Sequence, residues 1–372
     1  MSPTHYRLGN FPPKSIDWVR LVPLIGKANA ALGKYDSLVA TIPNSAVLLA
    51  PLVTQEAVLS SRIEGTNVTM GEVLAIEAGA GEDLPEYKRA DAEEVLNYRK
   101  ALGFAANALQ ERPLSHHLLR EAHAMLMNGV RGRDKGPGSF RTTQNWIGRA
   151  NSTIEQASFV PISPTQLGPG MDRWLAFLSK KDEPDALVQL AIVHAEFEAL
   201  HPFNDGNGRL GRMVIPLFLF ERGLLCGPHF YISGYLEAHR DAYIEHLRDV
   251  SSNEDWTGWC AFFLEAVVHQ ATENQRRARS ILSLYHDMQK RVARLTHTQY
   301  APLAIDFLFS NPIFYASHFV ENASIHRVAA NRLLRVLREA DILKVIRERK
   351  GRKPAILAFG EILNLAEGKQ IF

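Results

Sequence analysis

A chain of 372 residues suits two or three domains, and its apolar fraction of 46% is enough to build their cores. The charged fraction of 22% and the net charge of +2 exclude a disordered chain and give no global basic excess that demands nucleic acid. Two cysteines, Cys226 and Cys260, are too few for a disulfide framework, which favours a reducing compartment. Since no signal segment or membrane-spanning apolar run is present, we expect a cytoplasmic protein without membrane contact.

Residues 1–85 are expected to form an N-terminal helical region. Apolar residues recur at helical spacing from Ser15 to Leu32, and Gly33 should end that helix. The next helical pattern covers 44–65, where Pro51 either restarts or kinks the helix. A third helix is expected to begin near Thr69.

Residues 86–288 are expected to form the body of the protein, mainly from helices. Their expected ranges are 89–111, 115–127, 169–181, 184–200, a helix from Gly208 onward, 235–250 and 254–288. The helix over 184–200 is apolar on most sides and should be central. Between the helices, residues 132–170 are rich in Gly, Pro, Ser, Thr and Asn, with β-branched and aromatic residues at strand-like density. This segment predicts a small two-stranded flap.

Residues 289–372 are expected to form a separate winged helix-turn-helix module. A helix over YAPLAIDFLFSNP precedes a helix-turn-helix pattern in which Ser324 should cap the second helix. Two short strands around a basic turn at Arg349–Lys353 follow. A basic recognition helix and a basic wing would suit DNA, although winged helices also bind proteins.

The stretch HPFNDGNGRLGR, residues 201–212, joins two apolar helices and carries residue types that suit phosphate chemistry. Gly206 and Gly208 let the backbone approach a ligand, and the helix that begins near Gly208 directs its first N–H groups and its positive end at the same space. Arg209 and Arg212 are three residues apart and should project from one face of that helix. The pattern predicts an anion site sized for a polyphosphate.

Two further residues of this stretch suit a transfer reaction. The Asp205 carboxylate is a hard oxygen ligand of the kind that holds Mg²⁺ together with substrate phosphates. The His201 imidazole titrates near neutrality and could take a proton from a hydroxyl group. A tight turn with a solvated arginine face is the simpler interpretation of each residue alone, but their occurrence in one short window favours a site.

The same window resembles the signature of the Fic family, HPFx(D/E)GNGRxxR, with every defining position matched. Upstream, GSFR at 138–141, WIG at 146–148 and FVPISP at 159–164 also resemble that family. The resemblance implies a Fic-type helical bundle with a β-hairpin flap and an enzyme that transfers AMP from ATP to a Ser, Thr or Tyr hydroxyl of a target protein. ATP and Mg²⁺ are the implied cosubstrate and metal.

The resemblance also assigns roles to individual residues. His201 would be the base, Asp205 would hold Mg²⁺, and Arg209 and Arg212 would stabilise the phosphates. The rest of the implied phosphate-binding loop is Gly206, Asn207, Gly208, Leu210 and Gly211. Tyr243 resembles the tyrosine on the adenine side. Gln156, Ala157, Ser158 and Phe159 would line the site from the flap, where the target would dock as an added strand.

A second motif, SSRIEG at 60–65, resembles the (S/T)xxxE(G/N) inhibitory motif of Fic proteins. A glutamate near a helix C-terminus is unfavourable with the helix dipole, so Glu64 calls for another explanation. By the resemblance, Ser60, Glu64 and Gly65 form an inhibitory segment in which Glu64 pairs with Arg212. The enzyme would then restrain itself.

Other functions remain open from the sequence. A γ-phosphate transferase or a de-AMPylase could use the same loop, although the family branch that transfers phosphate has a lysine where Arg209 stands. A DNA-binding regulator that acts through residues 289–372 is the alternative of another class. Self-modification and a homodimer are also left open.

Overall fold

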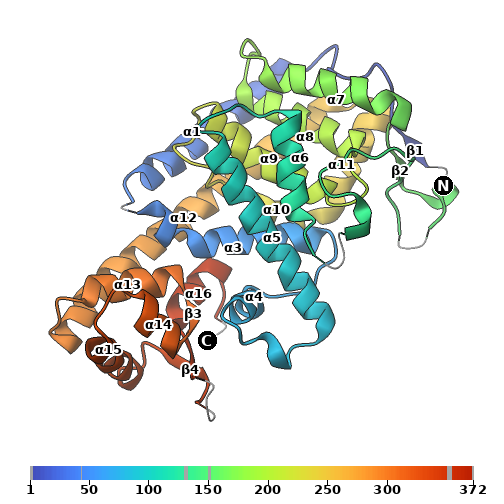
Figure 1. Ribbon diagram of the computed structural model, residues 1–372. Helices are drawn as coiled ribbons and strands as arrows, with labels where there is room; N and C mark the ends of the chain where they lie inside the picture. Colours follow the sequence, from blue (N-terminus) through green and yellow to red (C-terminus); the bar gives the residue numbers. More distant parts are fainter. Residues whose placement is uncertain (1–2, 43, 130–132, 150–151, 350–353, 371–372) are drawn as a thin grey trace. The chain divides into compact units, whose positions relative to one another are not determined.

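The computed structural model describes residues 3–42, 44–129, 133–149, 152–349 and 354–370. The chain divides into two compact units. The first unit comprises residues 1–36, 59–65 and 97–272, and the second comprises residues 37–58, 66–96 and 273–372. The regular structure of both is mainly helical, as the apolar periodicity predicts (Figure 1). The division expected at residues 85 and 288 stays a prediction.

The helices that contribute to the first unit cover most of its length. They are α1 (Trp18–Ala40), α3 (Ala50–Ile63), α5 (Glu86–Ala108), α6 (His116–Leu126), α7 (Pro164–Ser179), α8 (Ala186–Leu200), α9 (Asn207–Glu221), α10 (Ser233–Ala238), α11 (Arg240–Asn253) and α12 (Trp256–Thr296). Helices α1, α3, α5 and α12 continue into the second unit. Short 3-10 turns lie at Arg133–Lys135 and Ile154–Gln156 in this unit and at Gly81–Asp83 in the second unit.

Helix α8 is central in the first unit. Nearly all of its side chains are buried, and it packs on α7, α9 and α11 (Figure 1). Its start is fixed by Asp185, whose Oδ1 accepts the N–H groups of Leu187 and Val188 at 2.9 Å each. Its end is fixed by His201 in the left-handed region (φ 47°), followed by Pro202, which cannot continue a helix. The expected central helix is therefore confirmed.

Two helix boundaries differ from the prediction. Helix α1 continues through Gly33 to Ala40, because Leu32 and Tyr35 bury their side chains on the same face and outweigh the cost of about 1 kcal/mol for one glycine. Pro51 was expected either to restart or to kink the helix over 44–65, and the structure shows a restart. A four-residue helix α2 (Ser45–Leu48) ends before α3 begins at Ala50.

The flap contains less strand than expected. Among the flap residues that the structure describes, which exclude 150 and 151, Ile147 forms one isolated antiparallel bridge with Phe159, where a two-stranded hairpin was expected. Strand β2 (Phe159–Val160) pairs in parallel with β1 (Thr4–His5) from the N-terminal region, where Thr4 lies beside Phe159. The pairing partner of β2 is thus a segment far away in sequence, which local strand propensity cannot indicate.

The second unit contains α2, α4 (Met70–Glu77) and the C-terminal elements. Helix α4 begins directly after Thr69, as expected, and Thr69 caps it in a capping box formed with Glu72. The C-terminal elements are α13 (Ala301–Ser310), β3 (Ile313–Tyr315), α14 (Ala316–Asn322), α15 (Arg327–Glu339), β4 (Lys344–Arg347), β5 (Ile356–Ala358) and α16 (Gly360–Glu367). The three strands form an antiparallel sheet in the order β3-β5-β4.

This C-terminal arrangement agrees in element order with the expected winged helix-turn-helix, whose identity stays a prediction. Strand β3 and helix α16 are additions to what the sequence indicated. One detail was wrong: Ser324 lies in the turn in the left-handed region (φ 55°), and His326 precedes α15 without a side-chain cap. Of the expected basic turn, residues 350–353 lie outside the described residues.

Candidate functional site

The loop from His201 to Gly206 connects the two most buried helices of the first unit, α8 and α9. Gly206 forms the N-cap of α9 in the left-handed region (φ 75°), and a Cβ atom there would approach Met127 Sδ to 2.8 Å. Only glycine fits both conditions. Because α9 begins at Asn207, its first N–H groups face the loop, as expected for an anion-binding helix end.

Residues far from the loop in sequence hold it in place. His123 stacks on Phe203, with ring centroids 3.7 Å apart. Its Nε2 lies 2.9 Å from the carbonyl oxygen of Asp205, while its Nδ1 accepts the Gly138 N–H at 2.9 Å. Nε2–H therefore donates to the loop carbonyl, and the ring is neutral. The stack and the bonds fix the loop against α6.

Arg141 and Asn145 hold the start of the loop. The Arg141 Nε donates to the His201 carbonyl oxygen at 2.9 Å, and the Asn145 amide donates to the Phe203 carbonyl at 3.0 Å. The Asn207 side chain closes the loop, since its Oδ1 accepts the Phe203 N–H and its Nδ2 donates to the Phe203 carbonyl, both at 2.8 Å. Its amide therefore stabilises the loop, where a direct phosphate contact was expected.

The His201 imidazole is oriented to act as a base. Its Nδ1 lies 3.3 Å from the Glu198 carbonyl oxygen, which can only accept, so the proton belongs on Nδ1 and the lone pair on Nε2. Burial lowers the pKa of this ring from 6.5 to about 4, so it is neutral at physiological pH. His201 also lines the cavity beside the loop.

That cavity has a volume of about 180 Å³ and lies within the first unit. Three polar residues from the sequence motifs, Glu64, His201 and Arg212, occupy its wall together with Gly208. The other described lining residues are Ile63, Ile147, Ser158, Phe159, Ala195, Glu198, Ala199, Arg240, Tyr243, Ile244, Leu247 and Arg248. An apolar wall beside an anion-binding helix end suits a ligand with an aromatic base and a phosphate chain.

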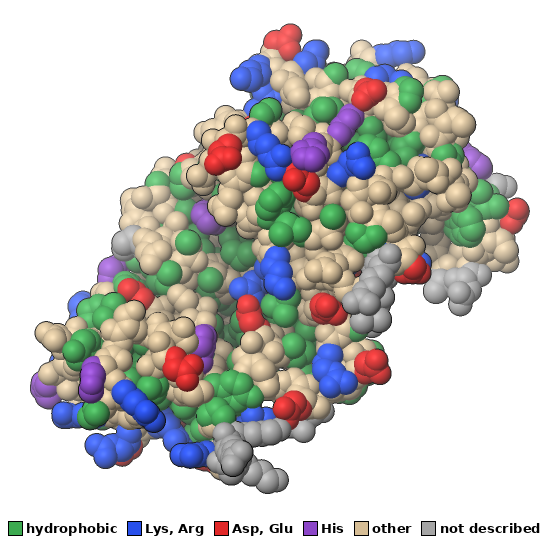
Figure 2. Space-filling model, viewed as in Figure 1, with side chains coloured by type: hydrophobic (Ala, Val, Ile, Leu, Met, Phe, Trp, Pro, Cys, Tyr) green, Lys and Arg blue, Asp and Glu red, His purple; other side chains and the backbone are tan. Residues whose placement is uncertain are grey.

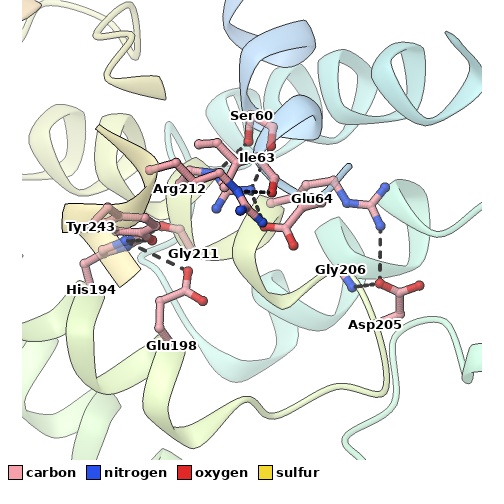
Figure 3. A network of polar contacts seen from close by, with 12 residues as sticks. Ser60, Ile63, Glu64, His194, Glu198, Asp205, Gly206, Gly211, Arg212 and Tyr243 are labelled. Atoms are coloured by element: carbon pink, nitrogen blue, oxygen red, sulfur yellow. Dashed lines mark hydrogen bonds and ion pairs between the residues drawn. The ribbon is translucent and has the colours of Figure 1, made fainter. Parts of the chain in front are cut away.

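The ion pair expected between Glu64 and Arg212 is present. The Arg212 Nη2 donates to the Glu64 Oε1 at 2.6 Å and to the Ser60 carbonyl at 2.9 Å, and its Nε donates to the Ser60 hydroxyl at 2.9 Å (Figure 3). The Arg212 side chain is 1% exposed and that of Glu64 is 40% exposed. Burial alone would raise the pKa of Glu64, but the charge of Arg212 lowers it.

Glu64 also lies against the helix end. A Cβ atom at Gly208 would approach Glu64 Oε1 to 2.1 Å, so the carboxylate occupies the space directly above that glycine. Gly65, in the left-handed region (φ 100°), lets the chain turn away after Glu64. The segment that carries Ser60, Glu64 and Gly65 thus brings a negative charge to the site where an anion was expected.

The two arginines of the loop take different partners, which differs from the shared face expected for them. Arg212 turns to Ser60 and Glu64, whereas the Arg209 Nη2 lies 3.5 Å from Asp205 Oδ1 and 3.9 Å from Met127 Sδ. Asp205 Oδ1 also accepts the Gly206 N–H at 2.6 Å. Between them, Leu210 is fully buried and anchors the first turn of α9.

A buried cluster of three polar side chains, His194, Glu198 and Tyr243, lies on the other side of Arg212. His194 Nε2 lies 2.9 Å from the Tyr243 hydroxyl and 3.9 Å from Glu198 Oε1 (Figure 3). Gly211 leaves the space for this carboxyl, since a Cβ there would lie 2.5 Å from Glu198 Oε1. Tyr243 lies at the cavity wall as expected from the sequence, and burial raises its pKa, so its hydroxyl stays neutral.

The flap residues are only partly at the cavity. Ser158 and Phe159 line it, whereas Gln156 and Ala157 do not. The Gln156 side chain accepts the Thr153 N–H at 3.3 Å, and Ala157 is buried. The expectation that all four residues line the site is therefore wrong for the first two.

The opposed pKa shifts of the buried groups predict a stability maximum near pH 6.5. Burial raises the pKa of Glu196 to about 8 and of Glu198 to about 7. As the pH is lowered from 8, these carboxyls therefore take up protons in the folded protein before they do so in the unfolded chain, and this uptake stabilises the fold. Burial lowers the pKa of His123 and His201 to about 4 and of His194 to about 3. Below pH 6.5 the unfolded chain therefore takes up more protons, and stability falls.

We expect the free energy of unfolding to fall by about 1 kcal/mol per pH unit on each side of this maximum. Denaturant unfolding at pH values from 5 to 8.5 measures it. A stability that rises steadily to pH 8.5 would contradict the assignment of the two carboxyls.

Comparison with family models gives two matches. The model described as Fic/DOC family N-terminal matches residues 22–107, and the model described as Fic/DOC family matches residues 113–219. Together they cover more than half of the chain.

Curated relatives match the chain over a limited part of their length. Protein adenylyltransferase fic-1 of Caenorhabditis elegans is 26% identical over 166 residues, which are 43% of this chain and 30% of the relative. A probable protein adenylyltransferase of Aquifex aeolicus is 34% identical over 102 residues, 27% of this chain and 29% of the relative. The chain thus spans about a third of the length of these relatives.

Solved structures share the fold. A Fic family protein from Desulfovibrio desulfuricans G20 superposes with a TM-score of 0.59 at 21% identity, covering 94% of this chain and 98% of that one. Residues 134–508 of Fic-1 from C. elegans give a TM-score of 0.55 at 20% identity, covering 72% and 76%. No described helix is long and apolar enough to cross a bilayer.

Proposed function

Because the chain belongs to the Fic/DOC family, we propose that it transfers AMP from ATP to a Ser, Thr or Tyr hydroxyl of a target protein and releases pyrophosphate. The observation that carries this proposal is the Nε2 lone pair of His201 at a cavity that also meets the N-terminus of α9 and Arg212. A neutral base, an anion-binding helix end and an apolar wall are the parts that a nucleotidyl transfer needs. The names of the curated relatives support the same reaction.

In the proposed reaction, His201 Nε2 accepts the proton of the target hydroxyl. The hydroxyl oxygen then bonds to the α-phosphorus of ATP, and the bond from that phosphorus to the bridging oxygen of the β-phosphate breaks. The helix N–H groups from Asn207 to Arg209 would hold phosphate oxygens, and the Arg209 charge would stabilise the leaving pyrophosphate. Tyr243 and the apolar wall would receive the adenosine.

Asp205 fits the role of a Mg²⁺ ligand in the presence of a nucleotide. Its side chain is 47% exposed at the loop surface, where a phosphate chain on the helix end could share the ion. Among the described residues, no group of three or more His, Cys, Asp or Glu side chains could hold a metal ion. Mg²⁺ is usually bound through one or two carboxylates together with substrate phosphates. Bound there, the ion would neutralise phosphate charge.

Replacing Asp205 with asparagine tests this role. We expect the Mg²⁺ concentration for half-maximal transfer to rise by about 10- to 100-fold, because the amide lacks the negative charge that attracts the ion. Titration calorimetry of ATP with and without Mg²⁺ gives a second readout, in which the variant should lose only the Mg²⁺-dependent part of the affinity. An unchanged Mg²⁺ dependence would remove Asp205 from this role.

We propose further that Glu64 restrains the enzyme. Its carboxylate lies over Gly208 and accepts an N–H of Arg212 Nη2, a group that would otherwise bind the γ-phosphate. ATP could then bind only in a displaced position with its α-phosphorus away from His201. The inhibitory segment precedes the loop in the same chain, and the contact between Glu64 and Arg212 is formed within that chain.

A target that docks on the flap as an added strand would meet the edge of β2 that already pairs with β1 of this chain. Thr4 and Tyr6 donate their backbone N–H groups to the carbonyls of Ser158 and Val160 at 3.3 and 2.9 Å. A target strand that adds to this edge would replace the N-terminal segment, whose Tyr6 hydroxyl also donates to Glu196 at 2.7 Å. Docking on β2 would therefore compete with the pairing of β1.

A γ-phosphate transferase and a de-AMPylase remain the alternatives on the same site, and self-modification and dimer formation belong to the proposal. Mass spectrometry of protein incubated with ATP and Mg²⁺ separates them, since an AMP group is several times heavier than a phosphoryl group. We expect AMP on a hydroxyl side chain, of the protein itself or of a target in a lysate. A modification with the mass of phosphate would overturn the proposed transfer of AMP.

A further inference from the structure

Helix α15 presents a basic face that the transferase reaction does not use. Ala330, Leu333, Leu334 and Leu337 bury their side chains on one side of the helix. At helical spacing, Arg332 and Arg335 lie opposite this side, and Arg327, Asn331 and Arg338 lie along one flank of it; all five are exposed. From residue 327 to 349 the chain has seven basic and three acidic residues.

The acidic neighbours only partly offset this charge. Arg335 lies 3.9 Å from Glu339, Arg338 lies 3.2 Å from Glu348, and Lys344 lies 2.5 Å from Asp341. These pairs are exposed and therefore weak. Among the residues that the structure describes, no carboxylate pairs with Arg327 or Arg332. Lys and Arg side chains gather over α15 and β4 (Figure 2).

The surroundings of α15 shape this face for an extended ligand. Helix α14 packs on α15 through a turn of residues 323–326, the geometry of a helix-turn-helix. On the other flank, a groove of about 590 Å³ runs between α15 and the sheet. Its walls carry Arg335, Arg338 and Lys344 together with Asn331 and two acidic residues, Glu339 and Asp341. A thirteen-residue helix is about 20 Å long and fits the major groove of B-DNA.

We propose that this basic face, defined by Arg327, Asn331, Arg332, Arg335, Arg338 and Lys344, binds duplex DNA. Helix α15 would lie in the major groove, the arginines would contact phosphates on both sides, and Asn331 would reach base edges. An acidic protein could also meet a basic face, but the helix-turn-helix geometry and the length of the charged row favour a duplex. This activity is separate from the transfer of AMP.

The test uses the full chain and a fluorescein-labelled 30-base-pair duplex of mixed sequence, followed by anisotropy between 50 and 200 mM KCl. We expect binding that weakens with salt, with a slope of about 3 to 4 in log Kd against log salt for about four phosphate contacts. The double variant Arg332→Glu with Arg335→Glu should bind at least about tenfold more weakly, and its slope should fall by about 2. Arg20→Glu, which reverses the charge of one exposed arginine of α1, is the control away from this face and should bind as the parent does.

The thermal unfolding midpoint of each variant shows whether the fold is kept, and the milder Arg332→Gln with Arg335→Gln serves if the double glutamate variant unfolds. Absence of binding at 50 mM KCl would overturn the proposal, and an acidic protein would then be the better candidate for the partner of this face. An equal loss of binding in Arg20→Glu would also overturn it, because the contact would then be general attraction.

Discussion

Glu64→Gly is expected to raise the rate of AMP transfer by about 10- to 100-fold, which corresponds to a coupling free energy of about 1.4–2.8 kcal/mol. The physical reason is the contact between Glu64 and the buried Arg212, at 2.6 Å. Removing the carboxylate frees the Arg212 N–H that it accepts, and it opens the space above Gly208 for the γ-phosphate, while the Ser60 contacts keep the guanidinium in place. Because the Glu64 side chain is 40% exposed, solvent screens the pair, and a larger gain is not expected.

Graded variants separate the charge of Glu64 from its bulk. Glu64→Gln keeps the shape without the charge and should give an intermediate rate. Ser60→Ala removes one of the two Ser60 contacts to Arg212 and leaves the carbonyl contact at 2.9 Å, so we expect a change of only a few fold. The measurement is AMP incorporation from ATP labelled at the α-phosphate. Equal rates for the parent and Glu64→Gly, with ATP bound by both, would contradict the restraint.

His201→Ala is expected to lower transfer by about 10²- to 10⁴-fold, the usual contribution of a general base. ATP affinity should change little, because the helix N–H groups and arginines would hold the phosphates. Since burial lowers the pKa of His201 to about 4, its neutral form persists through the physiological range. The acid limb of the pH–rate profile should therefore lie below pH 5 and not near 6.5.

His117→Ala is the matched control, because that histidine is 72% exposed on α6 and touches no part of the loop. It should keep the parent rate. Transfer that survives in His201→Ala would remove this residue from the role of base, and an acid limb near pH 6.5 would show that a different, exposed group titrates.

The helical body and the central loop could be predicted from the sequence because their signals are local. The apolar surface of residues 184–200 required a buried helix, and Pro202 required its end at His201. The glycines of the loop and the two arginines indicated an anion site because they lie within one short stretch of sequence. The motif at residues 60–65 was found only through its resemblance to a family, since its partner Arg212 lies 148 residues from Glu64.

The supports of the site could not be predicted, because they join segments far apart in the chain. Arg141 holds the His201 carbonyl from 60 residues away, and His123 holds Asp205 from 82 residues away. Arg141 lies in the GSFR segment that resembles the family, but neither that resemblance nor the sequence indicated which carbonyl it holds. Asn145 and His123 carried no signal beyond being polar side chains in a loop and in an apolar helix. The parallel pairing of β1 with β2 gave no local signal at all.

The central claim is that His201 drives an AMP transfer that Glu64 holds back. It is tested most directly by AMP incorporation from α-labelled ATP into three proteins: the parent chain, Glu64→Gly, and Glu64→Gly combined with His201→Ala. The account predicts little label in the first, strong label in the second and almost none in the third. Strong label in the parent chain, or label that persists in the double variant, would contradict it.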